Sequence, residues 1–488
     1  MTENVETMTE NVETTSRHSF LTFLSFGTYN ILWTIPTATM SLFMFFFYHT
    51  VVGLEAGWIL TVVAINTIWA GLNDPLIGWL TDRNFKWTRK WGRRFPWIAI
   101  AFIPEALSLI MIFSPPDLPK TPLGVLINPL PVMLWLLLSL FVFDLFATLV
   151  DVHTAILRAD KFRTETERRK GAGSWGFFDM IAQVLGMMIP PLLLFFGATI
   201  LSYAVMAAII ALIAIIFGIL FVLKGAREDK IIIDRYYSRD YERLHVLKGV
   251  WQVIKQKSFM ALFAHYVLWL AATASLMTGM VAYLVTFIFQ SNDPDAMIPF
   301  LALFLLGSLI SIPVWLKILK KMKNNKKTYL IGSFLLVVLT VPMTFFQGDI
   351  SLMIIIFLVG FGNGCVWTIG MPVLYSNAQD DFVVRTGKNQ KGIMVGTWAV
   401  IGLATAFIDE ALITLVFAIT GFNAGLEDYA ALVASGADVV LVEWGIRFLL
   451  GVIPALLILL GTLIFWKFYP LTQEKVMENK AKLLELGF

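Results

Sequence analysis

Long runs of apolar residues recur along the whole chain, and short segments that carry most of its charge separate them. A helix needs about 20 mainly apolar residues to cross the hydrocarbon core of a bilayer. Twelve runs of this kind are present, and we predict a membrane-spanning helix in each of them. The predicted spans are residues 20–48, 56–80, 96–114, 130–157, 173–196, 200–223, 258–289, 297–317, 328–346, 351–376, 392–420 and 444–468.

The connections between the predicted spans alternate between basic and acidic composition. Loops 81–95, 158–172, 318–327 and 377–391 are rich in Lys and Arg, and so is the longer segment 224–257, whereas the intervening connections carry mainly Asp and Glu. Positively charged loops remain on the cytoplasmic side of a membrane during insertion. We therefore expect a multi-pass protein of the cell membrane with both termini in the cytoplasm.

The charged segment 224–257 follows the sixth predicted span and divides the chain into two halves of six spans. Duplicated halves are typical of secondary transporters, whose substrate site lies near the bilayer midplane between them. We predict a disordered tail, an N-terminal six-helix bundle, a cytoplasmic central loop, a C-terminal six-helix bundle and a cytoplasmic tail. These are residues 1–19, 20–223, 224–257, 258–469 and 470–488.

The composition supports lipid as the solvent of most of the surface. Hydrophobic residues make up 58% of the chain and charged residues 15%, against about 45–50% and 25% in soluble domains. The single cysteine, Cys365, excludes disulfides and cysteine-based metal sites. The formal net charge of +3 gives no indication of a nucleic-acid partner.

Acidic residues within the predicted spans have few basic partners. An ionised carboxylate at the bilayer centre costs about 2.5–3.5 kcal/mol even on permissive scales. Each acid must therefore face a wet cavity, be protonated, or be neutralised by a bound cation. This pattern indicates cation coupling. The acids concerned are Asp74, Glu105, Asp144, Asp151, Asp179, Asp409 and Glu410.

Two of these acids are our candidates for the coupling site. Asp144, Thr148 and Asp151 are spaced i, i+4 and i+7, so they share one helix face. Asp74 is predicted at a depth comparable to that of Asp151, roughly 9 Å to the cytoplasmic side of its helix centre. Because hard cations take oxygen ligands, we predict that Asp74 and Asp151 bind Na⁺ or H⁺. Structural hydrogen bonding or the lining of a cavity is the alternative.

Other residues are candidates for the solute site. Asp144 lies near mid-helix, and His153, next to this cluster of acids, could relay protons, with a structural hydrogen bond as the alternative. Asp409 and Glu410 are adjacent and point to different faces, so at least one should face the cavity and meet a solute hydroxyl or a cation. Aromatic side chains can stack on sugar rings, and Trp367 is our candidate among them.

A cytoplasmic latch is predicted in loop 81–95. Asp82 could pair with Arg93 or Arg94, and Gly78 would allow a close approach at this point. Such a latch would close in one access state of a transporter. The alternative is that these charges only set the topology.

Several stretches resemble a known family. NDPLIGWLTD at 73–82, followed by WGRRFPWI at 91–98, resembles the glycoside–pentoside–hexuronide:cation symporters, the melibiose-permease-like branch of the major facilitator superfamily. Asp380, followed by RTGK at 385–388, resembles the second cytoplasmic signature of that family, and the segment 445–472 resembles its last helix and tail.

This resemblance implies an all-α membrane protein with the major-facilitator fold, in which two six-helix bundles rock around a central cavity. It also implies that Asn73 and Asp74 lie at the family's cation site and that Asp151 is within a residue of the sugar-contacting acid of melibiose permease. By the same resemblance Asp380 and Arg385 belong to the gating elements. Apart from a Na⁺ at Asp74, no metal or cofactor is expected.

The chain also departs from the family pattern. Ala70 stands where melibiose permease has a second cation-binding aspartate, and Thr34 replaces its sugar-binding acid on the first helix, which makes Thr34 a candidate solute contact. Asn389 and Lys391 replace Arg and Glu in the second signature. These differences argue against melibiose itself, and they make H⁺ a rival to Na⁺ as the coupling ion.

Three functions follow as hypotheses. The first is cation-coupled symport of a sugar, glycoside or related small organic solute by alternating access. The second is symport of an amphipathic, lysolipid-like solute, which the phenylalanine-rich run 43–47 favours. The third is an integral membrane enzyme, which would need a clustered metal or catalytic set that the sequence does not show. The five histidines are scattered along the chain, at His18, His49, His153, His245 and His265.

Overall fold

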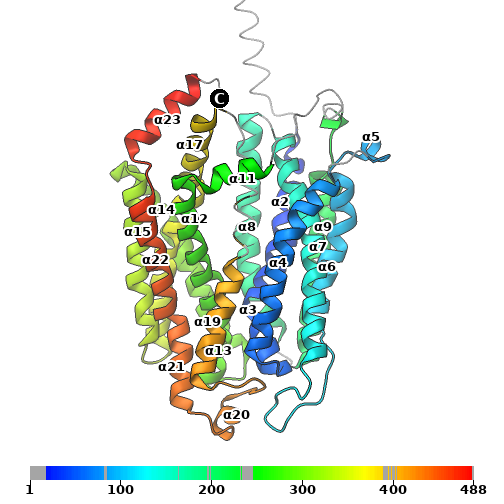
Figure 1. The fold of residues 1–488 in the computed structure, drawn as a ribbon, viewed down its shortest axis with the longest axis vertical. Coiled ribbons are helices and arrows are strands. Elements are labelled where there is room, and N and C mark those ends of the chain that lie inside the picture. The colour runs from blue at the N-terminus through cyan, green and yellow to red at the C-terminus, as the bar shows by residue number, and fades with distance from the viewer. Residues whose placement is uncertain are drawn as a thin grey trace, which may run out of the picture. The chain divides into compact units, whose positions relative to one another are not determined.

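The computed structural model is built from helices (Figure 1). It describes residues 18–81, 85–162, 164–194, 197, 199–230, 232–233, 246–387, 394, 397, 402 and 404–485. Across these residues no strand occurs, and a single isolated bridge joins Lys120 and Leu126. The predicted all-α fold class is confirmed.

In the described part of the chain, eleven helices are long and apolar enough to cross a membrane. They match eleven of the predicted spans. Of the predicted span 392–420, the structure describes α19 (Ala404–Thr420) and three isolated residues before it.

Some boundaries differ from the prediction for local reasons. The first span extends over Phe20–Val52, with a single turn residue, Thr28, between its first two helices, and the π-helical segment η1 (Phe47–Val52) carries it past the predicted end at 48. The helix α8 (Glu165–Leu193) begins eight residues before the predicted span at 173. A capping box at Thr164 and Glu167 satisfies the first free backbone N–H groups of α8, so its charged first turns are helical.

The chain folds into two compact units. The first unit comprises Met1–Met40, Ile68–Pro119 and Asn128–Glu242, and the second comprises Ser41–Thr67, Lys120–Ile127 and Arg243–Phe488. The second unit therefore includes one end of each of the first two spanning helices. The predicted bundles 20–223 and 258–469 follow chain order, whereas these units follow packing, so the predicted boundaries stay a prediction.

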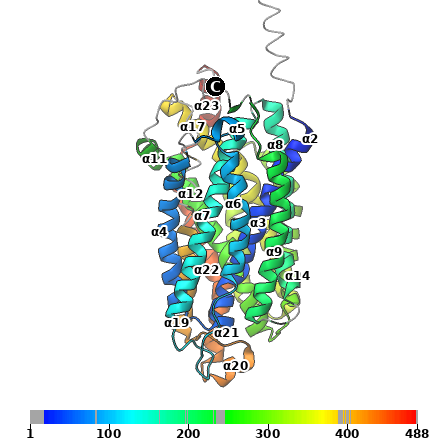
Figure 2. The same cartoon turned by 90° about the vertical axis from the view of Figure 1, so that its right-hand side faces the viewer.

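The first unit is built around α6, which packs against α7 and α9 (Figure 2). The Trp135 indole Nε1 on α7 donates to the Met111 carbonyl on α6 at 2.8 Å, which fixes the two helices against each other. Helices α3 and α4 continue into the second unit. The helices are α2 (Phe20–Gly27), α3 (Tyr29–Phe46), α4 (Ala56–Thr81), α5 (Thr88–Trp91), α6 (Phe95–Ile112), α7 (Leu130–Lys161), α8, α9 (Ile200–Leu220) and the π-helical η2 (Phe221–Gly225).

The second unit contains the remaining helices and several short π-helical or 3₁₀ segments. Within the predicted central loop and C-terminal tail, it has the helices α11 and α23. The elements are α11 (Val246–Ile254), α12 (Lys257–Leu270), η3 (Ala271–Met277), α13 (Thr278–Tyr283), η4 (Leu284–Ile288), η5 (Pro294–Met297), α14 (Ile298–Met322), α15 (Asn325–Thr340), η6 (Val341–Thr344), α16 (Asp349–Cys365), η7 (Val366–Tyr375), α17 (Ser376–Thr386), α19, α20 (Tyr429–Ala434), α21 (Val439–Leu450), α22 (Val452–Phe468) and α23 (Gln473–Glu485).

A pair of glycines sets the packing of α14 on α16. A Cβ atom added to Gly307 would overlap the Phe357 carbonyl oxygen, and one added to Gly360 would overlap the Phe304 carbonyl oxygen. Small residues let helix backbones approach closely in membranes. The Ser308 hydroxyl donates to the Gly360 carbonyl at 3.1 Å and secures the crossing.

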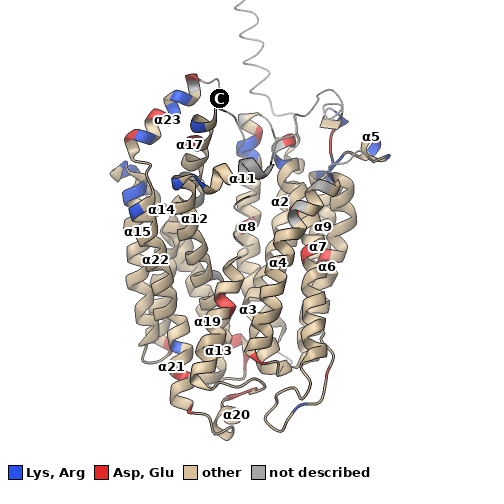
Figure 3. Ribbon diagram, viewed as in Figure 1, with Lys and Arg blue, Asp and Glu red and all other residues tan. Residues whose placement is uncertain are grey.

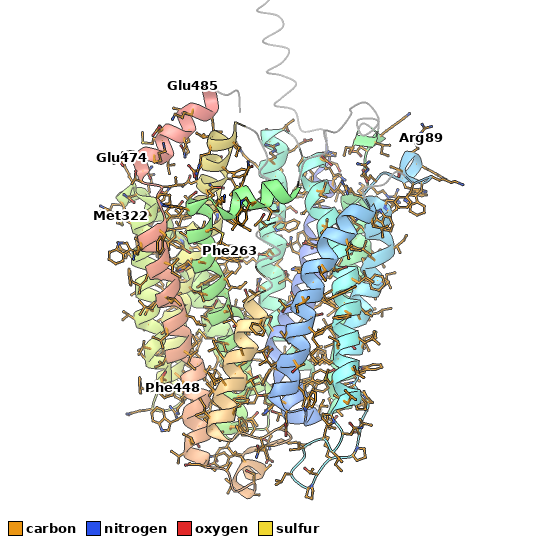
Figure 4. The ribbon with its side chains drawn as sticks, viewed as in Figure 1. Arg89, Phe263, Met322, Phe448, Glu474 and Glu485 are labelled. Carbon is orange, nitrogen blue, oxygen red and sulfur yellow. The ribbon has the colours of Figure 1, made fainter. Side chains whose placement is uncertain are left out.

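Charge gathers at one end of the helices within each unit, where most described Lys and Arg residues lie (Figure 3). Along the helices the outward-facing side chains are apolar: Phe448 on α21 projects outward from its helix and is 40% exposed (Figure 4). A surface of this kind suits hydrocarbon rather than water. The basic ends are those that the positive-inside rule predicts to be cytoplasmic, and the other ends are called the outer ends below.

Candidate functional site

A buried acidic cluster lies inside the first unit. The Tyr29 hydroxyl of α3 donates to Asp151 Oδ1 of α7 at 2.6 Å. Glu105 of α6 is 1% exposed, and its carboxyl group is close enough to Asp151 and Tyr29 to interact with them electrostatically. Three helices thus bring two acids and a phenol together.

The predicted cation residue Asn73 is fixed against the same helix that carries Asp151. Its amide nitrogen donates to the Asp144 carbonyl oxygen at 3.1 Å and to the Thr148 hydroxyl at 3.0 Å. Because Asp144, Thr148 and Asp151 share a face of α7, Asn73 binds this face from α4. The neighbouring Asp74 lies on α4, but its side chain is outside the described residues, so its predicted role stays a prediction.

Thr34 also contacts an acid of the first unit. The hydroxyl of Thr34, on α3, donates to Asp179 Oδ1 of α8 at 3.5 Å. The sequence singled out both residues but gave no reason to pair them. Tyr29 was missed altogether, because a tyrosine in an apolar helix gives no local signal of an acidic partner on another helix.

His153 lies at the basic end of the first unit. It is fully buried, its Nδ1 atom is 3.4 Å from Arg94 Nη1, and its ring stacks on Trp97 with the ring centroids 6.3 Å apart. The structure thus brings His153 to a predicted gating residue. Its predicted contact with the solute stays a prediction.

The predicted latch is described only in part. Asp82 lies outside the described residues, and so does any pairing that it makes with Arg93 or Arg94. At Gly78 an added Cβ would meet no atom of the described residues within 4 Å. Arg94 is the N-cap of α6, where the carboxylate oxygen Oε1 of Glu228 accepts the backbone N–H groups of Arg94 and Phe95. Glu228 therefore stabilises the N-terminus of α6.

Lys161 is a buried cation that the sequence pattern did not distinguish from topology-setting charge. It lies just past the apolar span Leu130–Arg158 and is 4% exposed. Its Nζ atom donates to the carbonyl oxygens of Lys224, Gly225 and Arg227 at 3.0, 2.8 and 2.8 Å. Burial lowers the pKa of Lys161 to about 8. Lys161 thereby connects the end of α7 to the end of η2.

In the second unit, three side chains bind Asp381, the neighbour of the predicted Asp380. Asp381 is 5% exposed, and its Oδ2 accepts from Ser258 Oγ at 2.8 Å and from Gln256 Nε2 at 3.0 Å. Its Oδ1 accepts from Asn479 Nδ2 of α23 at 3.2 Å. Asp380 is partly buried and Arg385 exposed, and their gating role stays a prediction.

The remaining solute candidates also lie in the second unit. Trp367 of η7 is 41% exposed and meets Trp269 edge-on, with ring centroids 5.4 Å apart. Asp409 and Glu410 of α19 are 2% and 8% exposed. The candidates are thus divided: Thr34, Asp144 and His153 belong to the first unit, and Trp367, Asp409 and Glu410 to the second. Among the residues that the structure describes, no three His, Cys, Asp or Glu side chains form a metal cluster.

A solved structure shares this arrangement of helices. A bacterial homologue of the human lysosomal transporter Spinster, in an inward-facing and unoccupied conformation, matches with a TM-score of 0.63 at 12% identity. The match covers 95% of this chain and 99% of that one. A likeness at this identity shows the fold, which is that of the major facilitator superfamily.

The model of the family of MFS/sugar transport proteins matches residues 25–473, and the chain belongs to this family. It is therefore a multi-pass membrane transporter, and its resemblance to the glycoside–pentoside–hexuronide symporters is confirmed. The family and its structural neighbours are transporters rather than enzymes.

Two relatives support this assignment along most of the chain. The inner membrane symporter YicJ of Escherichia coli K12 is 24% identical over 451 residues, 90% of each chain. The sodium-dependent lysophosphatidylcholine symporter 1 of Mus musculus is 21% identical over 453 residues, which cover 87% of this chain and 80% of that protein.

Proposed function

We propose that this transporter is a secondary active symporter that couples the downhill movement of a cation to the movement of a sugar, glycoside or related small organic solute. The observation that carries the proposal is the environment of Glu105. Its side chain is 1% exposed, and neither carboxyl oxygen has a hydrogen-bond partner among the described residues. Asp151 and Tyr29 lie close to it.

An ionised carboxylate in such surroundings would be strongly destabilised, because nothing replaces the water that it lost on folding. The charge of Asp151 nearby adds to the cost, since two carboxylates in one site repel each other. A proton or a cation that enters this cluster removes the penalty. The cluster is therefore a place where uptake of positive charge is energetically coupled to the conformation of the protein.

A proton is the coupling ion that this geometry favours. A metal cation needs several oxygen ligands, whereas a carboxyl group holds a proton without any further ligand. Within the described part of the chain, neither carboxyl oxygen of Glu105 has a hydrogen-bond partner, and the Tyr29 hydroxyl already binds Asp151. Na⁺ bound at Asp74 is the rival.

The solute class rests on the family and on one structural observation. The family consists of sugar transporters by description, and one relative is a lysophosphatidylcholine symporter. The phenylalanine-rich run that favoured a lipid-like solute is packed inside the protein: Phe43, Phe45, Phe46 and Phe47 are each no more than 7% exposed. These rings are occupied by intramolecular contacts in this state, which favours the sugar-like solute.

The test uses the purified protein in sealed liposomes, with uptake of labelled glycosides measured under an imposed pH gradient or Na⁺ gradient. We expect the pH gradient to drive uptake and Glu105→Gln to reduce it by about 10-fold or more, with solute exchange at equal concentrations retained. Glu443→Gln, which removes a partly exposed carboxyl group from α21, is the matched control.

The outcomes separate the parts of the proposal. Uptake driven by Na⁺ alone, and unchanged by Glu105→Gln, would overturn the proton assignment and leave Asp74 as the ion site. Uptake of a labelled lysolipid that glycosides do not inhibit would replace the solute class. Uptake that depends on neither the pH gradient nor the Na⁺ gradient would contradict symport itself.

A further inference from the structure

Three glycines from three separate connections meet at the outer end of the second unit. Gly53 follows η1, Gly124 lies in the connection 120–127, and Gly425 lies in the connection after α19. Their φ angles are +83°, +81° and +78°. Residues with side chains rarely adopt this backbone region, which favours glycine at all three positions.

The three backbones are in direct contact. A Cβ atom on Gly53 would overlap the Gly124 carbonyl oxygen, and a Cβ atom on Gly124 would overlap the Gly425 carbonyl oxygen. One on Gly425 would overlap the carbonyl group of Gly124 in return. No position has room for a single methyl group. We call Gly53, Gly124 and Gly425 the glycine clasp.

Main-chain hydrogen bonds hold the clasp together. The Gly425 N–H donates to the His49 carbonyl at 2.8 Å, and the Leu126 N–H donates to the Gly53 carbonyl at 3.0 Å. The Lys120 ammonium group donates to the Val51 carbonyl at 2.7 Å. The bonded groups lie far apart in the sequence, so each bond closes a contact between different connections.

An aromatic cluster adjoins the clasp through His49. The imidazole is 1% exposed, and the rings of four neighbours surround it. Its ring centroid is 4.9 Å from that of Phe417, 5.4 Å from Phe422, 5.7 Å from Phe45 and 6.0 Å from Tyr283. The ring centroids of Phe417 and Phe422 are 4.8 Å apart, so these two neighbours of His49 also contact each other.

The segments that meet in the glycine clasp and the aromatic cluster come from both halves of the sequence. Gly53, Gly124 and His49 come before the central segment 224–257 in the sequence, whereas Gly425, Phe417 and Phe422 come after it. In alternating access, the two halves of a transporter separate on one side of the membrane at a time. Contacts between the halves at the outer ends must therefore break whenever the solute site opens outward.

We propose that the glycine clasp and the aromatic cluster around His49 together form the outer gate of this transporter, closed in the present structure, and that the absence of side chains at the three glycines is what lets it close. The proposal rests on the proposed transport function only in assuming that the outer side opens. A methyl group on Gly124 or Gly425 would then favour the outward-open state.

The experiment measures access from outside, and so it does not depend on transport. In a Cys365→Ser background, Thr50→Cys places one thiol in η1, where the native side chain is 1% exposed. Intact cells are labelled with a membrane-impermeant maleimide. We expect Gly124→Ala and Gly425→Ala each to raise the labelling rate about fivefold or more, because a destabilisation of about 1 kcal/mol shifts a two-state population by that factor.

Gly436→Ala is the matched control. Gly436 also has a positive φ, +77°, in the connection that leads to α21, but an added Cβ there meets no atom within 4 Å. Equal labelling in all variants, or an equal rise in Gly436→Ala, would overturn the proposal. If the clasp variants fail to reach the membrane, Phe417→Leu, which thins the aromatic cluster, must raise labelling in their place. If the parent protein shows no gradient-driven uptake while the clasp variants still raise labelling, the gate proposal stands and the proposed symport alone is contradicted.

Discussion

The interiors of the two units satisfy their polar groups in different ways. In the first unit the polar core is acidic: Asp151 is bonded to Tyr29, and Glu105 lies beside them. In the second unit the polar core is built from neutral pairs. The Tyr329 hydroxyl is 2.8 Å from His265 Nδ1, and the Trp269 indole donates to Asn363 Oδ1 at 2.9 Å.

This difference suggests separate roles for the two polar cores: the acidic one takes part in ion coupling, and the neutral one stabilises the fold. A neutral pair formed on folding keeps the same partners throughout, so it adds stability and leaves the protonation state alone. Buried acids change their charge when a cation arrives and leaves, so they can respond to a gradient. We infer that ion coupling belongs to the first unit. The buried acids Asp381, Asp409 and Glu410 are exceptions in the second unit.

The largest expected effect on transport is that of Asp151→Asn in the first unit. The Tyr29 hydroxyl can still donate to the amide oxygen, so the local packing is kept while the charge is lost. We expect gradient-driven uptake to fall by about 10–100-fold, with the midpoint of thermal unfolding nearly unchanged. Uptake assays and thermal unfolding of the same preparation measure both. A large loss of stability together with full uptake per folded molecule would reverse the roles assigned to the two units.

Tyr329→Phe tests the second unit. It leaves His265 Nδ1 buried without its partner, which costs about 1–3 kcal/mol. We expect the midpoint of thermal unfolding to fall by roughly 2–6 °C while the gradient dependence of uptake stays as it was. Tyr429→Phe, at the start of α20, is the control that removes a hydroxyl from a less buried site. A changed coupling ion or pH profile in Tyr329→Phe would show that this pair is not merely structural.

Asn479→Ala tests the structural role of Asp381 at the basic end of the second unit. Asp381 would keep Ser258 and Gln256 but lose its bond to α23, a loss of about 1 kcal/mol. We therefore expect faster hydrogen exchange and faster proteolysis within α23, with uptake changed by less than about twofold. Lys480→Ala, which substitutes a neighbouring residue of α23, should leave exchange as in the parent protein.

The smallest effect concerns Glu478 on α23. Its Oε1 atom is 2.7 Å from Lys482 Nζ, and its Oε2 atom is 2.9 Å from Lys475 Nζ. Hydrogen bonds from Lys482 and then Lys475 lower the pKa of Glu478 from 4.5 to about 2. Because the folded-state pKa is depressed, this stabilisation is present above about pH 4.5 and is lost as the pH falls towards 2. Hydrogen exchange of α23 should rise slightly over that range, and Glu478→Gln should abolish the dependence.

The spanning helices were predictable because long apolar runs are a local signal. Their ends were less so: the charged start of α8 is helical because Thr164 caps it, and charge alone had indicated a loop. Within the site, the shared face of Asp144 and Asp151 followed from helical spacing. The roles of Tyr29 and Lys161 could not be predicted in this way, because their partners lie on helices that are distant in the sequence and are brought together only by packing.

The crossing at Gly307 and Gly360 has a mechanical consequence. Because their backbones are in direct contact, α14 and α16 cannot slide past each other without a steric clash, so the pair moves as one rigid body. Beyond its end, α16 continues into the π-helical η7, where Pro372 supplies no N–H to the helix ladder. A π-helical segment that lacks a backbone hydrogen bond bends more easily than the α-helix α16 before it. Bending of this part of the second unit is therefore concentrated at η7, the segment that carries Trp367.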